Sequence, residues 1–193
     1  VPMQSVDCGL VPRDNRGNLN LNAPIGKYLK VGQCVAGSHQ FKAQKGLNIN
    51  QIYCNMKNVV ENCFDVIKKH FPDATVSSGF RNGTNNSQHN KGEALDIVFT
   101  SRPKSSYYEV AKKIKDLVPF DQLLLEYRGT SSAWIHISLK KNGVFNSMFV
   151  LSIITAVISL LPLVYGLSYF TFVGALITMA LVTECILIKM QQK

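Results

Sequence analysis

The sequence contains no CxxC pair of cysteines, no run of five or more basic residues and no pattern of aromatic and basic residues suited to base stacking. The first absence argues against a zinc site built from cysteines, because such sites usually place their ligands in close pairs. The other two argue against a nucleic-acid partner. The N-terminal residues also lack a basic segment followed by an apolar run, so we predict no secretory signal there.

Charge is nearly absent from residues 148–188, in which Glu184 is the single charged residue. Residues 1–146 carry 19 Lys and Arg against 11 Asp and Glu, and therefore account for +8 of the net charge of +9. A basic domain suits an anionic surface such as a cell wall or a lipid headgroup layer, although the same charge also serves solubility alone. The length of 193 residues fits one domain of ordinary size.

The uncharged segment predicts a transmembrane hairpin. Its 41 residues, as a single helix rising about 1.5 Å per residue, extend to about twice the thickness of a bilayer core. We therefore expect two spans, near 147–165 and 168–188, which form a transmembrane helical hairpin over residues 147–189. Lysines flank the hairpin at both ends and no charge lies in its turn, so both ends are expected on the cytoplasmic side. The alternative is a hydrophobic hairpin buried in the protein core.

The first 46 residues are rich in Gly, Asn, Pro and Gln, and we interpret residues 1–46 as an arm or a linker with one or two short strands. The cysteines leave the disulfide pattern open. Cys8 and Cys34 are able to pair, although nothing in the sequence requires it. Cys54 and Cys63 lie nine residues apart on one predicted helix and point in different directions, so they cannot pair with each other.

Periodicity predicts two helices and four strands within residues 47–142. Apolar residues at helical spacing predict a helix over 50–70, with Asn50 as its N-cap and His70 as an exposed residue at its polar end. A second apolar stripe predicts a helix over 106–118. The strands are expected at 74–77, 93–99, 121–127 and 133–139. Because the connections are short, we expect an α+β domain with a small, mostly antiparallel sheet and flanking helices.

Two histidines and an aspartate predict a metal site. His89 and Asp96 are seven residues apart with Gly92 between them, so one loop-to-strand element can aim both side chains at the same point. His136 follows in a strand-like run, and two His and one Asp with an open fourth position form the ligand set of a catalytic zinc ion. The alternatives are polar core histidines, and an arginine in place of a metal as the partner of Asp96.

These residues belong to a longer series of motifs that spans about residues 47–140. The series resembles the M15 zinc metallopeptidases, and more narrowly the D-Ala-D-Ala carboxypeptidase-like peptidases that phages and bacteria use on peptidoglycan. The N-terminal segment and the uncharged segment lie outside the resemblance. The motifs, in chain order, are Ser-Gly-Phe-Arg at 78–81, Ser-Gln-His-Asn-Lys-Gly-Glu-Ala-Leu-Asp-Ile at 87–97, Phe-Asp-Gln-Leu at 120–123 with Glu126, and Trp-Ile-His-Ile-Ser at 134–138.

The resemblance implies roles for individual residues. It implies that His89, Asp96 and His136 bind Zn²⁺. It implies that Arg81 stabilises the oxyanion or binds a substrate carboxylate, a task that suits its planar charge. Ser87 is expected to orient its loop or to contact the substrate.

The general base is where the sequence departs from this family. Several members place a glutamate three residues before the last histidine, where this chain has Ala133. Glu126, at the end of the neighbouring strand, is our candidate for the base or for a residue that orients a ligand. Glu93 is a second candidate. It lies an odd number of residues before Asp96 on the same predicted strand, so we expect its side chain to point to the other face, away from the metal.

The expected function is zinc-dependent hydrolysis of peptidoglycan stem peptides, at a D-Ala-D-Ala or an L-Ala-D-Glu type of bond. One alternative is a membrane-anchored binding or structural protein with an inactive peptidase domain. Another is a holin-like membrane protein fused to a wall-cutting domain. The expected partners are the peptidoglycan peptide and, through residues 147–189, a membrane. Since a cytoplasmic domain does not meet peptidoglycan, delivery to the host cell envelope by a virion, or release at lysis, is also expected.

Overall fold

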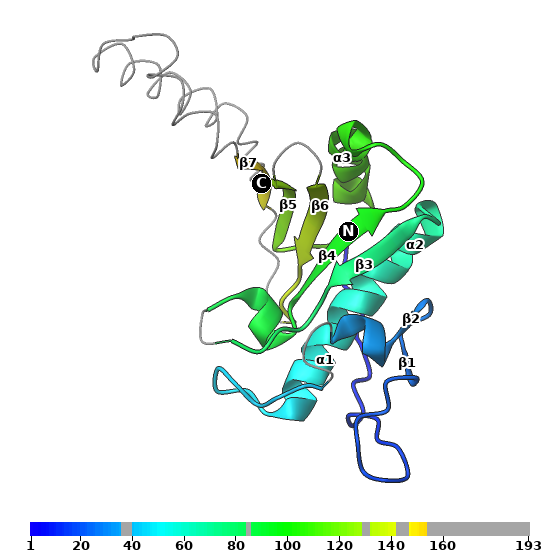
Figure 1. Ribbon diagram of the computed structural model, residues 1–193, viewed down its shortest axis with the longest axis vertical. Helices are drawn as coiled ribbons and strands as arrows, with labels where there is room; N and C mark the ends of the chain where they lie inside the picture. The colour runs from blue at the N-terminus through cyan, green and yellow to red at the C-terminus, as the bar shows by residue number, and fades with distance from the viewer. Residues whose placement is uncertain (36–39, 84–85, 129–131, 142–146, 154–193) are drawn as a thin grey trace, which may run out of the picture.

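The computed structural model describes residues 1–35, 40–83, 86–128, 132–141 and 147–153, and its longest helical stretch is drawn in cyan and turquoise in Figure 1. This stretch consists of α1 (Ile49–Val59), a π-helical turn η2 (Val60–Phe64) and α2 (Asp65–His70). The helix predicted over 50–70 is therefore confirmed. Its apolar stripe is buried, as helical spacing requires, and includes Ile52, Met56, Val59, Cys63 and Ile67.

The start of α1 differs from the prediction. Asn48, not Asn50, is the N-cap: its side chain accepts a hydrogen bond from the Gln51 amide at 2.9 Å, and the Gln51 side chain accepts one from the Asn48 amide at 2.8 Å. This reciprocal pair is a capping box. The Asn50 side chain instead accepts a hydrogen bond from the Val11 amide at 3.2 Å, so it holds the N-terminal segment against the helix.

A five-stranded sheet with the order β3-β4-β6-β5-β7 forms the other layer of the domain. The four predicted strands are confirmed with shifts of at most one residue at their ends, and all of their mutual pairings are antiparallel. The fifth strand, β7, pairs in parallel with β5. The strands are β3 (Ala74–Ser78), β4 (Ala94–Phe99), β5 (Gln122–Arg128), β6 (Ser132–Ser138) and β7 (Ser147–Ile153).

The two faces of this sheet have different roles. Leu95, Ile97, Ile135 and Ile137 belong to one hydrophobic cluster with the buried residues of α1, of α2 and of α3 (Tyr107–Leu117). Because successive strand residues point to opposite faces, the residues between these positions face away from the helices. The second predicted helix is thus confirmed as α3, and the chemistry-bearing residues Asp96 and His136 occupy the sheet face that the helices leave open.

The described residues of 1–46 pack against the domain. The small antiparallel sheet of β1 (Pro24–Ile25) and β2 (Leu29–Lys30) and the 3-10 turn η1 (Val31–Cys34) follow one another, and their apolar residues enter the same core. The segment meets the loop after β3, where the Phe80 amide donates to the Cys34 carbonyl at 2.7 Å. A Cβ on Gly79 would lie 2.4 Å from that carbonyl oxygen, so this contact requires glycine.

The disulfide joins Cys8 to Cys54 across 46 residues of sequence, not Cys8 to Cys34. Cys34 and Cys63 are free and buried. Burial, reinforced by the nearby Asp65 charge, raises the pKa of Cys34 to about 12, so this thiol stays protonated. The bridge therefore ties the N-terminal end of the chain to α1.

The predicted transmembrane hairpin falls almost entirely outside the described residues. Its first residues, 147–153, form strand β7 and not the beginning of a helix. Residues 154–189 are not described. In the part of the chain that the structure describes, no helix has the length and apolar character needed to cross a membrane.

Candidate metal centre

The pairing of β4 with β6 creates the first half of the site. Asp96 lies directly opposite His136 in the register of the two strands. Their neighbours on either side are core residues, so both side chains point to the open face of the sheet. Both are nevertheless mostly buried, with exposed fractions of 5% for Asp96 and 8% for His136.

His89 reaches this point from the 3-10 turn η3 (Gln88–Lys91), which directly precedes β4. The Ser87 side chain caps the turn by accepting a hydrogen bond from the His89 amide at 3.3 Å. Gly92 ends it with a φ of +74°, and a Cβ there would lie 2.4 Å from the Ile52 carbonyl oxygen of α1. The glycine between His89 and Asp96 therefore permits both the left-handed turn and the close packing on α1.

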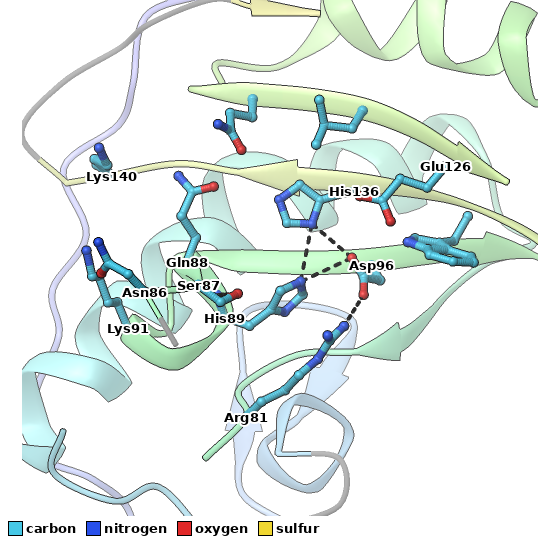
Figure 2. Close-up of a pocket in the computed structure, with 13 residues that line it drawn as sticks. Arg81, Asn86, Ser87, Gln88, His89, Lys91, Asp96, Glu126, His136 and Lys140 are labelled. Atoms are coloured by element: carbon cyan, nitrogen blue, oxygen red, sulfur yellow. Dashed lines mark hydrogen bonds and ion pairs between the residues drawn. The ribbon is translucent and has the colours of Figure 1, made fainter. Parts of the chain in front are cut away.

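The three side chains converge on one point, as Figure 2 shows. Asp96 Oδ1 lies 2.9 Å from His136 Nδ1 and 3.2 Å from His89 Nε2, and the two histidine nitrogens are 3.2 Å apart. His89 Nδ1 lies 2.7 Å from the Gly79 carbonyl oxygen, which can only accept a hydrogen bond. Nδ1 therefore donates its proton to this carbonyl, and Nε2 is the ring nitrogen that faces the cluster.

This group could hold a metal ion. Its donor set of two imidazole nitrogens and one carboxylate oxygen is the one found in many zinc sites. The hydrogen bond from His89 to a backbone carbonyl is the kind of outer contact that orients metal-ligating histidines. The predicted trio of His89, Asp96 and His136 is thus brought together, while the geometry does not identify the metal.

Asp96 stays ionised despite its burial. Burial by itself raises the pKa of a carboxyl group, but hydrogen bonds from His136 and His89, together with their charges, outweigh it and hold the pKa of Asp96 well below its usual range. Arg81 adds a second partner: its guanidinium forms an ion pair with Asp96 Oδ2, and its Nε donates to Ser78 Oγ at 2.8 Å. Of the two partners that the sequence left open for Asp96, the arginine is therefore present, and the other carboxylate oxygen faces the two histidines of the potential metal group.

A pocket of about 510 Å³ opens over the cluster. Six residues predicted for the site line it: Arg81, Ser87, His89, Asp96, Glu126 and His136. Glu126 reaches it because β5 and β6 are antiparallel, with Glu126 opposite Trp134 and Leu124 opposite His136. The register of these two strands thus brings Glu126 into the wall of the same pocket as the cluster.

The other two positions considered for the base lie elsewhere. Glu93 lines a separate pocket beside the Cys8–Cys54 disulfide, and burial raises the pKa of its carboxyl group. Ala133 is 2% exposed and belongs to the core cluster on the opposite face of β6. A glutamate at position 133 of this fold would therefore face the helices and not the pocket.

Sequence reasoning did not assign the other seven residues of the pocket wall to the site, namely Asn86, Gln88, Lys91, Gln122, Leu124, Trp134 and Lys140. The alternation of side chains along β5 could have identified Gln122 and Leu124, because they lie on the same face of the strand as Glu126. Lys91 and Lys140 carry no comparable signal, because Lys91 is the last residue of η3 and Lys140 lies beyond the end of β6. Each is one of many lysines in a basic chain.

A comparison of the chain with protein-family models gives no match, and a comparison with curated protein sequences gives no significant match. The resemblance to the M15 metallopeptidases is therefore carried by the motifs of this sequence alone. The geometry adds a buried trio of potential metal ligands at the floor of an open pocket, with a carboxylate in the pocket wall.

Proposed function

We propose that the protein is a zinc-dependent peptidase that hydrolyses peptide bonds in peptidoglycan stem peptides. The observation that carries this proposal is the convergence of His89, Asp96 and His136 beneath a pocket. Structural zinc sites are usually closed by four protein ligands, whereas catalytic sites have three and keep one position open. Three ligands under an open pocket agree with the catalytic arrangement.

A zinc ion held by these three side chains would polarise the scissile carbonyl and lower the pKa of an attacking water. Glu126, in the pocket wall, accepts the proton of that water and passes it to the leaving nitrogen. Arg81 keeps Asp96 in place through its ion pair, and its half-exposed side chain lies where it can also stabilise the developing oxyanion. Ser87 fixes the turn that presents His89.

The substrate class rests on the motif resemblance and on two further observations. The excess of basic over acidic residues in 1–146 suits the anionic cell wall. The Cys8–Cys54 disulfide suits an oxidising compartment, because disulfides are rare in the reducing cytoplasm. We therefore propose that the domain acts at the cell envelope, after delivery by a virion or release at lysis, although the lysines flanking 147–189 predict the cytoplasmic side.

The test is hydrolysis by the purified full chain after zinc loading. The substrates are purified peptidoglycan and short peptides that carry a D-Ala-D-Ala or an L-Ala-D-Glu bond, and the readout is release of new amino groups. We expect cleavage of one of these bonds, and loss of cleavage after chelation of the metal and in Glu126→Gln. A zinc-loaded chain that cleaves none of them contradicts the proposal.

A second candidate is a wall-binding protein whose peptidase site is inactive. The ion pair between Arg81 and Asp96 favours it, because the arginine already compensates the buried carboxylate without a metal. This candidate predicts that the chain sediments with purified peptidoglycan, that it releases no amino groups, and that chelators do not change its binding.

A further inference from the structure

The charges around the metal pocket are unevenly distributed. Arg81 and Asp96 pair with each other near the metal position, so their charges offset each other. The remaining carboxylate in the pocket wall is Glu126, and the remaining cations are Lys91 and Lys140. In Figure 2, Lys91 and Lys140 lie on one side of the histidines and Glu126 on the other.

The backbone at both lysines is firmly held. The Lys91 carbonyl accepts a hydrogen bond from the Asn55 side chain of α1 at 2.9 Å. The Lys140 amide donates to the Asp121 carboxylate at 2.6 Å, and the preceding Leu139 amide donates to the Glu93 carbonyl at 3.0 Å. The backbone positions of the two lysines are therefore fixed by hydrogen bonds to other elements.

Within the described residues, neither lysine forms an ion pair with a carboxylate. Both lysine charges act on Glu93, but no ion pair joins it to either of them. Its side chain lines the pocket beside the disulfide, which Lys140 also borders, and one of its oxygens is fully buried. The lysine end of the metal pocket therefore has two cations and no carboxylate in its wall. The side-chain amides of Asn86 and Gln88 line the same pocket and supply further hydrogen-bond donors.

We propose that Lys91 and Lys140 bind a carboxylate of the substrate and thereby fix which way a peptide lies across the metal centre. This inference rests on the proposed peptidase function. Two ammonium groups at one end attract an anion, while Glu126 at the other end repels it, so an anionic peptide has one favoured orientation. Two carboxylates of the substrate fit this role. One is the C-terminal carboxylate of the residue that is released, and the other is a side-chain carboxylate on the acyl side of the cleaved bond, such as that of a glutamate.

Peptides that differ in a single carboxylate distinguish these two sources. The full zinc-loaded chain is assayed with a D-Ala-D-Ala peptide, with its C-terminal amide, and with a peptide in which the acyl-side carboxylate alone is amidated. Amidation of the recognised carboxylate raises KM about tenfold, the value expected for loss of a charge-assisted hydrogen bond, and leaves kcat nearly unchanged. The other amidation has little effect.

Substitution of each lysine tests whether that residue recognises the carboxylate. Lys91→Gln and Lys140→Gln are expected to raise KM about tenfold for the carboxylate peptide, and not for the peptide that lacks the recognised carboxylate. Lys141→Gln is the matched control, because Lys141 adjoins Lys140 in sequence but lines the separate pocket beside the disulfide. Equal KM changes for both peptides, or no change in either lysine variant, would overturn the inference.

Binding of the peptides gives a readout that does not depend on turnover. Calorimetry on the zinc-loaded Glu126→Gln chain compares the carboxylate peptides with their amides, and each lysine variant is expected to lose the preference for the carboxylate. A chain that binds the carboxylate through these lysines but hydrolyses nothing contradicts the proposed function and leaves the binding inference standing. A chain whose peptide binding is the same with and without these lysines overturns the inference whatever the activity.

Discussion

Glu126 and His136 project from the same face of two adjacent antiparallel strands, because His136 pairs with Leu124 and Glu126 lies two residues further along β5. This register places a carboxylate in the wall of the pocket whose floor carries the potential metal ligands. The family that the motifs resemble often has its base on the strand of the last histidine, whereas here position 133 faces the core. The second carboxylate of this pocket, beside that of Asp96, therefore comes from β5, the strand next to β6.

Replacing Glu126 by Gln removes the proposed base and preserves the shape of the side chain. We expect the variant to keep its zinc and to lose about 10²–10⁴-fold in kcat. Zinc content and peptide hydrolysis are measured on the same preparation. Glu109→Gln, at an exposed position of α3, is the matched control and should keep wild-type activity. Undiminished hydrolysis in Glu126→Gln would remove this residue from the mechanism.

Arg81 is expected to act on the metal through Asp96. Because its guanidinium holds Asp96 Oδ2, Arg81→Gln should weaken zinc affinity about 10–100-fold, as loss of a contact to a metal ligand typically does. Competition with a zinc-binding dye measures this affinity. Arg102→Gln is the control, since Arg102 pairs with Asp73 outside the pocket. Unchanged zinc affinity with reduced kcat/KM would instead assign Arg81 to the substrate alone.

The disulfide between Cys8 and Cys54 is expected to stabilise the domain. It closes a loop with a sequence separation of 46 residues, and a bridge over such a loop contributes about 2–4 kcal/mol to the free energy of unfolding. Cys8→Ser should lose this amount in denaturant unfolding, and reduction of the wild type should have the same effect. Reductant should not change the stability of Cys8→Ser further. Equal stability of the oxidised and reduced wild type would contradict this role.

Asp73 and Arg102 predict a pH-dependent contribution to stability. The hydrogen bond from Arg102 to Asp73, together with the arginine charge, outweighs burial and lowers the pKa of Asp73 in the folded protein. A carboxyl group with a lowered folded pKa stabilises the protein above its unfolded pKa of about 3.9, and this stabilisation is lost as the pH falls through the folded value. Asp73→Asn should therefore be less stable than wild type by about 1 kcal/mol at neutral pH, with a smaller difference below about pH 4.

A double-mutant cycle separates this pair from its surroundings. The Arg102 guanidinium also lies 5.2 Å from the centre of the Phe71 ring, so Arg102→Gln alone removes more than the ion pair. The coupling between Asp73→Asn and Arg102→Gln at neutral pH, followed by Trp134 fluorescence, gives the contribution of the pair. A coupling that is zero at neutral pH, or one that grows in acid, would contradict the assigned cause.

The helices and strands of the domain were predictable where burial of one face gives the apolar residues a regular spacing in the sequence. The stripe of α1 and α2 and the alternation in β4 and β6 reflect contact with one core, and the same alternation puts Asp96 and His136 on one face. Strand β7 was not predictable in this way. Its residues begin a long apolar run that reads as a helix, and the strand depends on its pairing with β5, which no local pattern encodes.

Contacts between residues far apart in sequence account for the other differences. The partner of Cys8 depends on how the N-terminal segment packs onto α1, and five cysteines allow several pairings. The N-cap is Asn48, through its capping box with Gln51, and the Asn50 side chain instead accepts a hydrogen bond from the distant Val11 amide. The sequence offered an arginine or a metal as the partner of Asp96, while the fold places Arg81 and the two histidines on different oxygens of the same carboxylate.

The zinc content of the purified full chain tests the metal centre most directly. We expect about one zinc ion per chain, the stoichiometry of a single catalytic site, in the wild type and in His70→Ala, which removes an exposed histidine outside the cluster. His136→Ala should lose the bound zinc while keeping its fold by circular dichroism. A wild-type chain that binds no zinc, or a folded His136→Ala chain that binds it as tightly as wild type, would contradict the assignment of His89, Asp96 and His136 as the ligands.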